Sequence, residues 1–398
     1  MKTTDIIKKV FAVLTAFLSV FFFIRGITLL NGKSAAYSFS GTAEFIRVTQ
    51  ALEEDYSDET VCPVEFSTAD GRYTCVKNYS FEEWEALPSG ERITGYIYTS
   101  DEGTLAFPQE ADESDLAAAV KDIRADEAGG IFGFAIAAAL TCAGLAVISI
   151  FGRFFTPYEQ IWFLSILIAA SAVSVLVPEE DCNGVNGLVI MGLYLADTFL
   201  NILCELLISK QSKWNFIVSV FVEITEIAIC VVLSYRFATL ASTLFFWLPC
   251  DIVSFINWHK HPDRAEEELT EVRSLRGWQE AAILAGVAVW TVGVGFFLTT
   301  LDFGTDIFGG NRTLEIIVCF LDACASAVGI VNGVFILLRL REQWIAWYIS
   351  AVLEGVINVL SGQFVLLVLK FGYITNTTYG YIKWTKYIKQ LKETTKDA

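Results

Sequence analysis

The sequence predicts an all-α polytopic membrane protein of about ten transmembrane helices, with a small β-rich domain inserted near the N-terminus. Hydrophobic residues make up 54% of the 398 residues and charged residues only 18%, whereas a soluble domain averages about 25% charged residues. The apolar residues are grouped into runs of roughly 18 or more, the length that a helix needs to cross a bilayer. Polar and acidic residues are instead gathered in the segment 31–128.

Ten apolar segments are the predicted membrane spans. They are 10–30, 129–152, 160–178, 185–208, 214–235, 238–258, 277–300, 313–338, 344–360 and 362–384. The first has an alternative interpretation as a secretory signal peptide, because Lys8 and Lys9 precede its apolar run. No A-x-A cleavage site follows, and Arg25 ends the run, so an uncleaved helix is favoured.

Basic residues between the spans set the predicted orientation. Lysines and arginines precede the first span and occupy every second connection after it, and the positive-inside rule assigns such segments to the cytoplasm. The short connections on the other side contain only Arg236 and Arg312. We therefore expect a multi-pass protein of the cell membrane with both termini in the cytoplasm and residues 31–128 outside.

The external segment has the pattern of a β-rich domain. Two alternating runs in CPVEFSTADGRYTC flank Asp70-Gly71, a hairpin turn signal, and ERITGYIYTS predicts a further strand. ESDLAAAVKDIRADE then predicts a short amphipathic helix leading into the second span. A two-residue turn at Asp70-Gly71 offsets Cys62 and Cys75 by about four residues along the ladder, so a disulfide between them is disfavoured but stays open.

Charge and motifs exclude several classes of function. Much of the net charge of −17 belongs to the segment 31–128, and an acidic surface does not bind nucleic-acid phosphates. The sequence has no Walker loop, no metal-ligand spacing and no nucleophile elbow. We therefore expect no enzyme activity, no ATP-driven pumping, and neither a cofactor nor a metal site.

An internal repeat organises the C-terminal half. Residues 186–260 and 313–386 each contain three spans, and both copies begin and end on the same sides of the predicted membrane. An offset of 126 residues aligns aromatic positions: Phe245 with Phe371, Trp247 with Tyr373, and Trp258 with Trp384. The span 277–300 joins the copies, giving a parallel three-plus-one-plus-three arrangement with a substrate site between two bundles near the midplane.

Stretches of both repeats resemble the PnuC family of vitamin transporters, whose typical member carries nicotinamide riboside. They are KWNFIVSVF and LFFWLPCDIVSFINW in the first repeat, and FLDACASAVGIVNGVFILLRLREQWIAWYI and YITNTTYGYIKWTKY in the second. The resemblance covers about 186–388 and implies a SWEET-like fold and facilitated diffusion into the cell. It also implies a functional link to a separate cytoplasmic nicotinamide riboside kinase. The segment 31–128 resembles a small β domain of the DUF3592 type.

The resemblance divides the chain into five predicted parts. They are a first membrane helix (1–30), an extracytoplasmic domain (31–128), two accessory membrane helices (129–184), a seven-helix transporter domain (185–388) and a cytoplasmic tail (389–398). Three positions depart from the family pattern, because Asp251 and Gly333 stand where glutamine is usual and Ser254 where glycine is usual. Relatives carry thiamine or riboflavin, and these substrates stay open alternatives.

Charged residues within the spans are candidates for the cavity, because each costs about 2.5–3.5 kcal/mol at a helix centre. They are Glu205, Glu223, Glu226, Asp251, Asp322, Glu354 and Lys370. Asp251 and Asp322 lie where the family has polar residues, so we favour the cavity for both. For several others, structural pairing is an equal alternative, such as Lys370 with Glu354 or Asp322.

Aromatic and amide side chains complete the candidate substrate site. Trp344 and Trp347 share one helical face and would stack on a flat cationic ring, although Trp344 also suits a membrane interface. Asn376 and Tyr379 lie one turn apart and would bind an amide or ribose hydroxyl. The predicted substrate-binding residues are Trp347, Trp344, Asn376, Tyr379, Asp251, Asp322, Asn332 and Asn215.

The sequence therefore predicts facilitated diffusion of a ribosylated nicotinamide or a similar cationic aromatic vitamin through the lipid bilayer. A membrane-anchored receptor or sensor with a ligand-binding outer domain is the alternative from another class. Ten spans with an internal repeat exceed what an anchor requires, so the transporter is favoured. Assembly into a homo-oligomer is left open.

Overall fold

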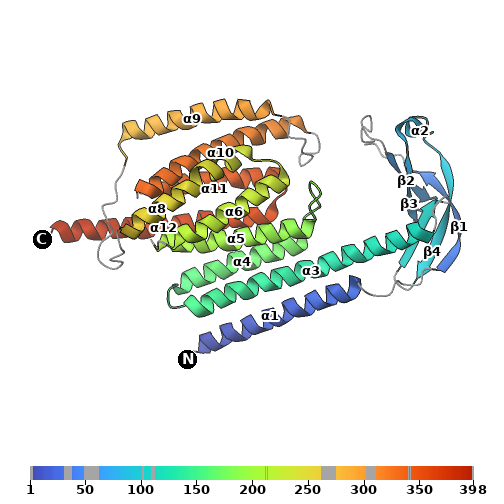
Figure 1. The fold of residues 1–398 in the computed structure, drawn as a ribbon, viewed down its shortest axis with the longest axis horizontal. Coiled ribbons are helices and arrows are strands. Elements are labelled where there is room, and N and C mark those ends of the chain that lie inside the picture. The colour runs from blue at the N-terminus through green and yellow to red at the C-terminus, as the bar shows by residue number, and fades with distance from the viewer. Residues whose placement is uncertain are drawn as a thin grey trace. The chain divides into compact units, whose positions relative to one another are not determined.

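The computed structural model describes residues 3–30, 38–48, 62–100, 103–108, 113–210, 212, 214–260, 275–301, 311–338, 340 and 342–396 (Figure 1). The chain divides into two compact units. One comprises Ile24–Gly129, and the other comprises Met1–Phe23 together with Gly130–Ala398. Each unit is described by itself.

The smaller unit contains a five-stranded antiparallel sheet in the order β3-β2-β1-β4-β5. Its elements are β1 (Ser38–Arg47), β2 (Cys62–Thr68), β3 (Thr74–Tyr79), the short helix α2 (Phe81–Glu85), β4 (Arg92–Ser100) and β5 (Gly103–Pro108). Phe45 and Phe66 are fully buried between the sheet and its covering residues. The predicted strands correspond to β2, β3 and β4.

The hairpin of β2 and β3 has the predicted register. Gly71 adopts a left-handed backbone conformation with φ of 67°, which suits glycine in a tight turn. Cys62 lies opposite Tyr79, and Cys75 lies opposite Phe66. The two cysteines are therefore four residues apart along the ladder and are not cross-strand neighbours.

The larger unit is helical. Its helices are α1 (Thr3–Leu30), α3 (Glu113–Phe151), α4 (Pro157–Leu176), α5 (Gly187–Ser209), α6 (Asn215–Leu233), α7 (Phe237–Ser242), the π-helical turn η1 (Thr243–Trp247), α8 (Leu248–Lys260), α9 (Gly277–Thr299), α10 (Arg312–Leu338), α11 (Gln343–Leu360) and α12 (Phe364–Lys396). Parts of α1 and α3 belong to the smaller unit. The predicted amphipathic helix is the start of α3, which continues into the second span without a break.

Nine helices among the described residues are long and apolar enough to cross a membrane. They include the run through α7, η1 and α8, which counts as one span. The protein is thus a multi-pass membrane protein. The tenth predicted span, 362–384, overlaps the first part of α12, whose 33 residues include Lys370 and a polar second half. Predicted loop residues in 261–274 and 302–310 lie outside the described residues.

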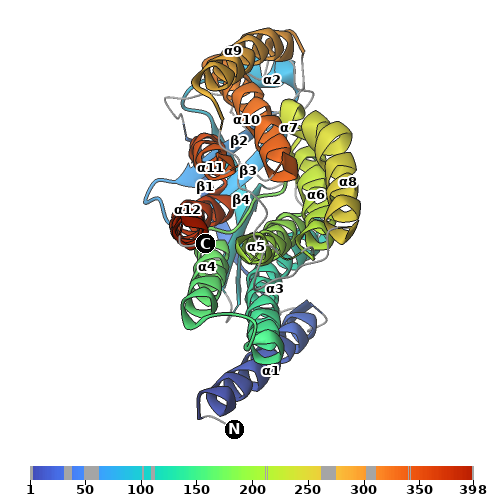
Figure 2. The same ribbon diagram turned by 90° about the vertical axis from the view of Figure 1, so that its left-hand side faces the viewer.

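Six helical segments form a closed ring (Figure 2). Around the ring α5 contacts α6, α6 contacts α8, α8 contacts α10, α10 contacts α11, α11 contacts α12, and α12 contacts α5. Outside the ring, α9 packs against α10, and α4 packs against α12 and α5. The ring thus consists of the helices of the two proposed repeats, and it encloses a pocket.

Two features shape the segment that joins α6 to α8, one within the segment and one from α10. Pro249 near the start of α8 cannot donate a backbone hydrogen bond, and the π-helical turn η1 comes directly before it. The carboxylate of Asp322, from α10, accepts hydrogen bonds from the backbone amides of Ala238 at 2.8 Å and Thr239 at 3.2 Å. Asp322 therefore caps the N-terminus of α7 from a distant helix.

Candidate functional site

A pocket lies within the ring of six helical segments. Its lining comes from α5, α6, the run from Arg236 through α8, α10, α11 and α12. Within the described residues, α1, α3, α4 and α9 contribute nothing to this lining. Residues far apart in the sequence, such as Asn201, Gly329 and Tyr373, thus face one space because the ring closes around it.

Three aromatic rings form one wall of the pocket. Trp247 of η1 and Trp347 of α11 lie 6.4 Å apart between ring centroids at an angle of 32°. The edge of Tyr373, on α12, meets Trp347 at 5.4 Å. Asn332 fixes the position of Trp347, because its amide, correctly oriented, accepts from the indole Nε1 at 3.1 Å and donates to the Gln343 carbonyl at 3.0 Å. This wall offers flat apolar surface with a polar edge.

A cluster of three charged side chains, the paired cluster, lies elsewhere in the lining. The Glu354 carboxylate contacts the Lys370 ammonium in a short ion pair and the Arg236 guanidinium at 3.5 Å. It also accepts a hydrogen bond from Ser350 at 2.9 Å. Of the two alternative partners considered for Lys370, the structure has Glu354. Arg236 lies in the predicted connection between two spans, from α6 to α7, but it is buried there, and its charge therefore needs a partner.

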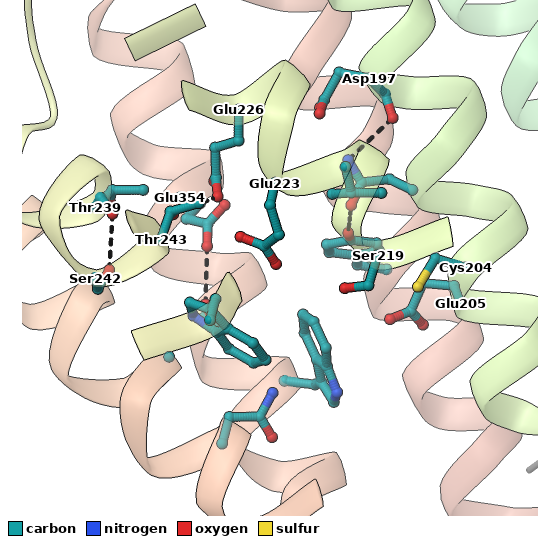
Figure 3. A pocket seen from close by; sticks show the side chains of 18 of the residues that line it. Asp197, Cys204, Glu205, Ser219, Glu223, Glu226, Thr239, Ser242, Thr243 and Glu354 are labelled. Atoms are coloured by element: carbon teal, nitrogen blue, oxygen red, sulfur yellow. Dashed lines mark hydrogen bonds between the residues drawn. The ribbon is translucent and has the colours of Figure 1, made fainter. Parts of the chain in front are cut away.

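Three further carboxylates of the pocket each accept a hydrogen bond. Asp197 accepts from the Thr225 hydroxyl at 2.7 Å, and Glu226 accepts from the Thr243 hydroxyl at 2.9 Å. Glu205 accepts from the amide of Asn376 at 2.6 Å. Figure 3 shows Asp197, Glu205 and Glu226 arranged around the same space.

Two carboxylates, the unpaired cluster, have a different environment. Glu223 is 5% exposed and Asp251 is 4% exposed. One carboxylate oxygen of each, Oε2 of Glu223 and Oδ2 of Asp251, has no hydrogen-bond partner among the described residues. In Figure 3 the Glu223 side chain points into the space between Glu226 and Ser219. The described lining contains six acidic residues and two basic ones, so it carries an excess of negative charge.

Four of the eight predicted substrate-binding residues lie in the pocket lining: Trp347, Asp251, Asn332 and Asn215. A fifth, Asn376, lies behind the lining and contacts it through Glu205. The remaining three lie elsewhere. Trp344 packs so closely on α12 that a Cβ added at Gly380 would lie 2.3 Å from its ring. It is therefore a packing residue.

Tyr379 and Asp322 also lie outside the lining. The Tyr379 ring packs against the Tyr158 ring with 4.7 Å between centroids, and its hydroxyl donates to the Glu159 carboxylate at 3.4 Å, which connects α12 to α4. Asp322 caps α7 as described above. Both residues have their partners away from the pocket lining.

Sequence reasoning overlooked several residues of the lining. Asp197 is an acid within the apolar segment 185–208, the same signal that led to Glu205, and it could have been found in that way. Trp247 and Tyr373 were aligned with each other as repeat positions without being assigned to the site, yet both line the pocket. Arg236 gave no sequence signal, because a residue between two spans is normally exposed.

Together, the spanning helices and the pocket that they enclose define a polytopic α-helical membrane protein with an internal acidic pocket. The family model described as "Nicotinamide mononucleotide transporter" matches residues 192–386. This C-terminal part of the chain belongs to that family, which is the PnuC family of the sequence comparison above.

Two curated relatives are similar to 59% of this chain. The "Nicotinamide riboside transporter PnuC" of Haemophilus influenzae is 22% identical over 237 residues, which cover 59% of this chain and 92% of the relative. The protein of the same name from Neisseria mucosa is 26% identical over 244 residues, which cover 59% of this chain and 83% of the relative. Among solved structures, that of the vitamin B3 transporter PnuC has a TM-score of 0.45 and 24% identity, covering 59% of this chain and 94% of the other.

Proposed function

We propose that this protein carries nicotinamide riboside, or a similar cationic aromatic vitamin, across the membrane by facilitated diffusion. The observation that carries the proposal is the pocket, where a pair of neighbouring tryptophans, tilted by 32°, meets an acidic lining. A pyridinium ring is flat and carries a fixed positive charge. Such a ring gains stacking and cation–π attraction of about 0.5–2 kcal/mol from a tryptophan face, and a further gain from nearby carboxylates.

Charge also favours the riboside over the mononucleotide. A phosphate adds about −1.5 to −2 charge at neutral pH. The described lining already has four more acidic than basic residues, and both basic residues contact or face Glu354. A phosphorylated substrate would therefore meet repulsion without a basic partner. The names of the two relatives, which specify the riboside, agree with this choice.

Equivalent positions of the proposed parallel repeats have equivalent surroundings, which supports the three-plus-one-plus-three arrangement. Trp247 and Tyr373 both line the pocket and both contact the Trp347 ring. Phe245 and Phe371 both face outward, with exposed fractions of 82% and 61%. The side chains of Trp258 and Trp384 lie outside the described residues. In this arrangement α9 joins the two triplets, and α12 supplies the tenth span.

The proposed orientation has both termini in the cytoplasm and the β-sheet unit outside. It rests on the distribution of lysines and arginines along the chain. Reporter fusions after Lys33 and after Lys392 should give opposite signals in a cell. The same signal from both fusions would contradict the ten-span arrangement.

Passive transport is the proposed mode, because the sequence contains no nucleotide-binding motif. A cytoplasmic kinase that phosphorylates the vitamin would then retain it in the cell. Purified protein in liposomes should equilibrate labelled nicotinamide riboside without ATP or sodium, at equal pH and without a membrane potential. Accumulation driven by an imposed sodium gradient would contradict passive transport.

The substrate is tested by comparing nicotinamide riboside, its neutral reduced form, thiamine and riboflavin for binding to the purified protein. Nicotinamide riboside should bind more tightly than its reduced form, because the two differ chiefly in the ring charge. Tighter binding of thiamine would keep the preference of the acidic pocket for a cationic ring and change the substrate, whereas tighter binding of riboflavin would reject the role of charge. Binding without uptake into liposomes would favour a receptor.

A further inference from the structure

Glu223 is one of two carboxylates of the pocket, with Asp251, that have an oxygen without a partner among the described residues. It lies near the middle of α6 and is 95% buried, with its Oε2 atom lacking a partner among the described residues. Ser219, one turn earlier on α6, lies in the same lining. Glu226 lies three residues later on the same helix, and Asp197 and Asp251 line the same pocket, so like charges surround Glu223. A negative charge on Glu223 is therefore opposed both by burial and by three acidic neighbours.

Four of the other five carboxylates of the pocket have groups that favour their charged form, and Asp251 is the exception. Thr225, Thr243 and Asn376 donate hydrogen bonds to one carboxylate each, and Glu354 has both basic residues beside it. The neighbours that oppose or support charge on Glu223 come from every packed element: Asp197 and Glu205 of α5, Glu226 of α6, Asp251 of α8, Glu354 of α11, and the bases Arg236 and Lys370. Cys204 and Tyr373 are the other titratable side chains of the described lining.

A metal ion is a poor explanation for this acidic excess. No three histidine, cysteine or acidic side chains among the described residues are grouped closely enough to hold one. Burying four uncompensated carboxylates would cost several kcal/mol each. Protonation of a carboxylate neutralises its charge and removes this cost, and it requires no set of metal ligands. A cationic substrate removes part of the same cost by placing a positive charge beside the carboxylates.

We propose that Glu223 is a proton-binding site of the empty pocket, and that a cationic substrate displaces this proton when it binds. The O–H bond of the Glu223 carboxyl breaks, the proton leaves to water, and the fixed positive charge of the substrate replaces it beside the carboxylate. No electrons are transferred. At equal pH on the two sides of the membrane, this exchange leaves the passive equilibrium of the substrate unchanged.

This inference rests on the proposed function, because it requires a cationic substrate. Its consequence is a substrate affinity that increases with pH wherever Glu223 is protonated in the empty pocket. One exchanged proton gives at most a tenfold increase in affinity per pH unit. A neutral ligand in the same pocket displaces no proton, so its affinity should not follow this slope.

The experiment is titration calorimetry of the purified full-length protein with nicotinamide riboside. Measurement in two buffers of different ionisation enthalpy at one pH gives the number of protons released per substrate bound. We expect close to one proton for the wild-type protein, and an affinity that increases with pH between 6 and 8. The neutral reduced riboside serves as the matched ligand and should release none.

Two variants locate the proton. Glu223→Gln keeps the size of the side chain and removes its titration, so proton release and the pH slope should both be lost. Glu315→Gln removes a carboxylate of α10 outside the pocket lining and should keep both. If Glu223→Gln does not fold, Glu223→Met is the second variant without a titrating group, and it should also lose proton release.

The outcomes separate this inference from the proposed function. Binding of nicotinamide riboside with no proton release and no pH slope would overturn the inference and leave the function standing. Proton release that persists in Glu223→Gln would also overturn it, since another group then holds the proton. Absence of any binding of nicotinamide riboside or thiamine would reject the function itself.

Discussion

The paired cluster and the unpaired cluster of the pocket show two ways in which a membrane protein keeps buried charge. Glu354 is held by two basic residues and a hydroxyl, whereas Glu223 and Asp251 each have an oxygen without a partner among the described residues. A carboxylate held by basic residues costs stability when it is removed, because its partners stay buried, but it has little attraction left for a ligand. An uncompensated carboxylate destabilises the empty pocket and attracts a cation. The difference separates a structural region from a binding region within one cavity.

Breaking the paired cluster should have the largest effect on the stability of the protein. Glu354→Gln leaves Lys370 and Arg236 buried without a carboxylate, and removing one partner of a buried pair costs about 3–5 kcal/mol. We expect a large fall in the thermal unfolding temperature in detergent. Glu223→Gln is the matched control, since it changes the same group in the same pocket, and it should leave that temperature nearly unchanged or higher.

A second substitution tests the reason for that loss. Lys370→Met combined with Glu354→Gln removes a charge that the single change leaves unpaired, so part of the lost stability should return. Equal stability of the single and double variants would show that the charge of Lys370 is not what destabilises the protein. The comparison between the two clusters would then lose its electrostatic basis.

Asp322→Ala should have the next largest effect, on stability and not on binding. The change leaves the amides of Ala238 and Thr239 at the start of α7 unpaired, at a cost of about 1–3 kcal/mol. The affinity of the folded fraction for nicotinamide riboside should stay close to that of the wild type, as measured by calorimetry. A large loss of affinity with unchanged stability would return Asp322 to the substrate site that the sequence predicted for it.

Asp251→Asn should weaken binding by about tenfold, equivalent to roughly 1.4 kcal/mol. It removes a carboxylate of the unpaired cluster and restores an amide, the type of side chain usual in the family. The affinity for the neutral reduced riboside should change little, because that ligand has no fixed positive charge. Equal affinities of the two proteins for both ligands would make the acidity of Asp251 structural or incidental.

Patterns along the chain predicted the architecture better than the site. Apolar run lengths and the Asp70-Gly71 turn act locally, so the nine spans and the register of β2 and β3 could be expected from them. The edge strand β5 and the central strand β1 have weaker alternation, and their pairing with β4 is a tertiary contact. Such contacts leave little trace in a single sequence.

The site depended on how the ring closes, which residue types alone do not specify. Trp344 and Trp347 are the same type of residue and lie three positions apart on α11, yet only Trp347 lines the pocket. Trp344 instead packs against α12, where Gly380 allows close approach. Gly333 replaces a glutamine usual in the family, and a Cβ there would lie 2.5 Å from the Phe246 ring. The Phe246 ring therefore fills the space next to α10 that a glutamine side chain at position 333 would need.

Trp247→Phe should have the smallest effect and sharpen the comparison at the aromatic wall. Tryptophan gives stronger cation–π attraction than phenylalanine, and the difference is expected to be about 0.5–1 kcal/mol, or twofold to fivefold in affinity. Both forms of the riboside lose stacking area, but only the cationic form loses cation–π attraction, so the ratio of their affinities should narrow. Trp344→Phe, outside the lining, is the matched control and should leave this ratio unchanged in the folded protein. If the affinity ratio responds to Trp344→Phe and not to Trp247→Phe, the aromatic recognition site lies outside the pocket. The acidic clusters of the pocket would then not contact the substrate ring either.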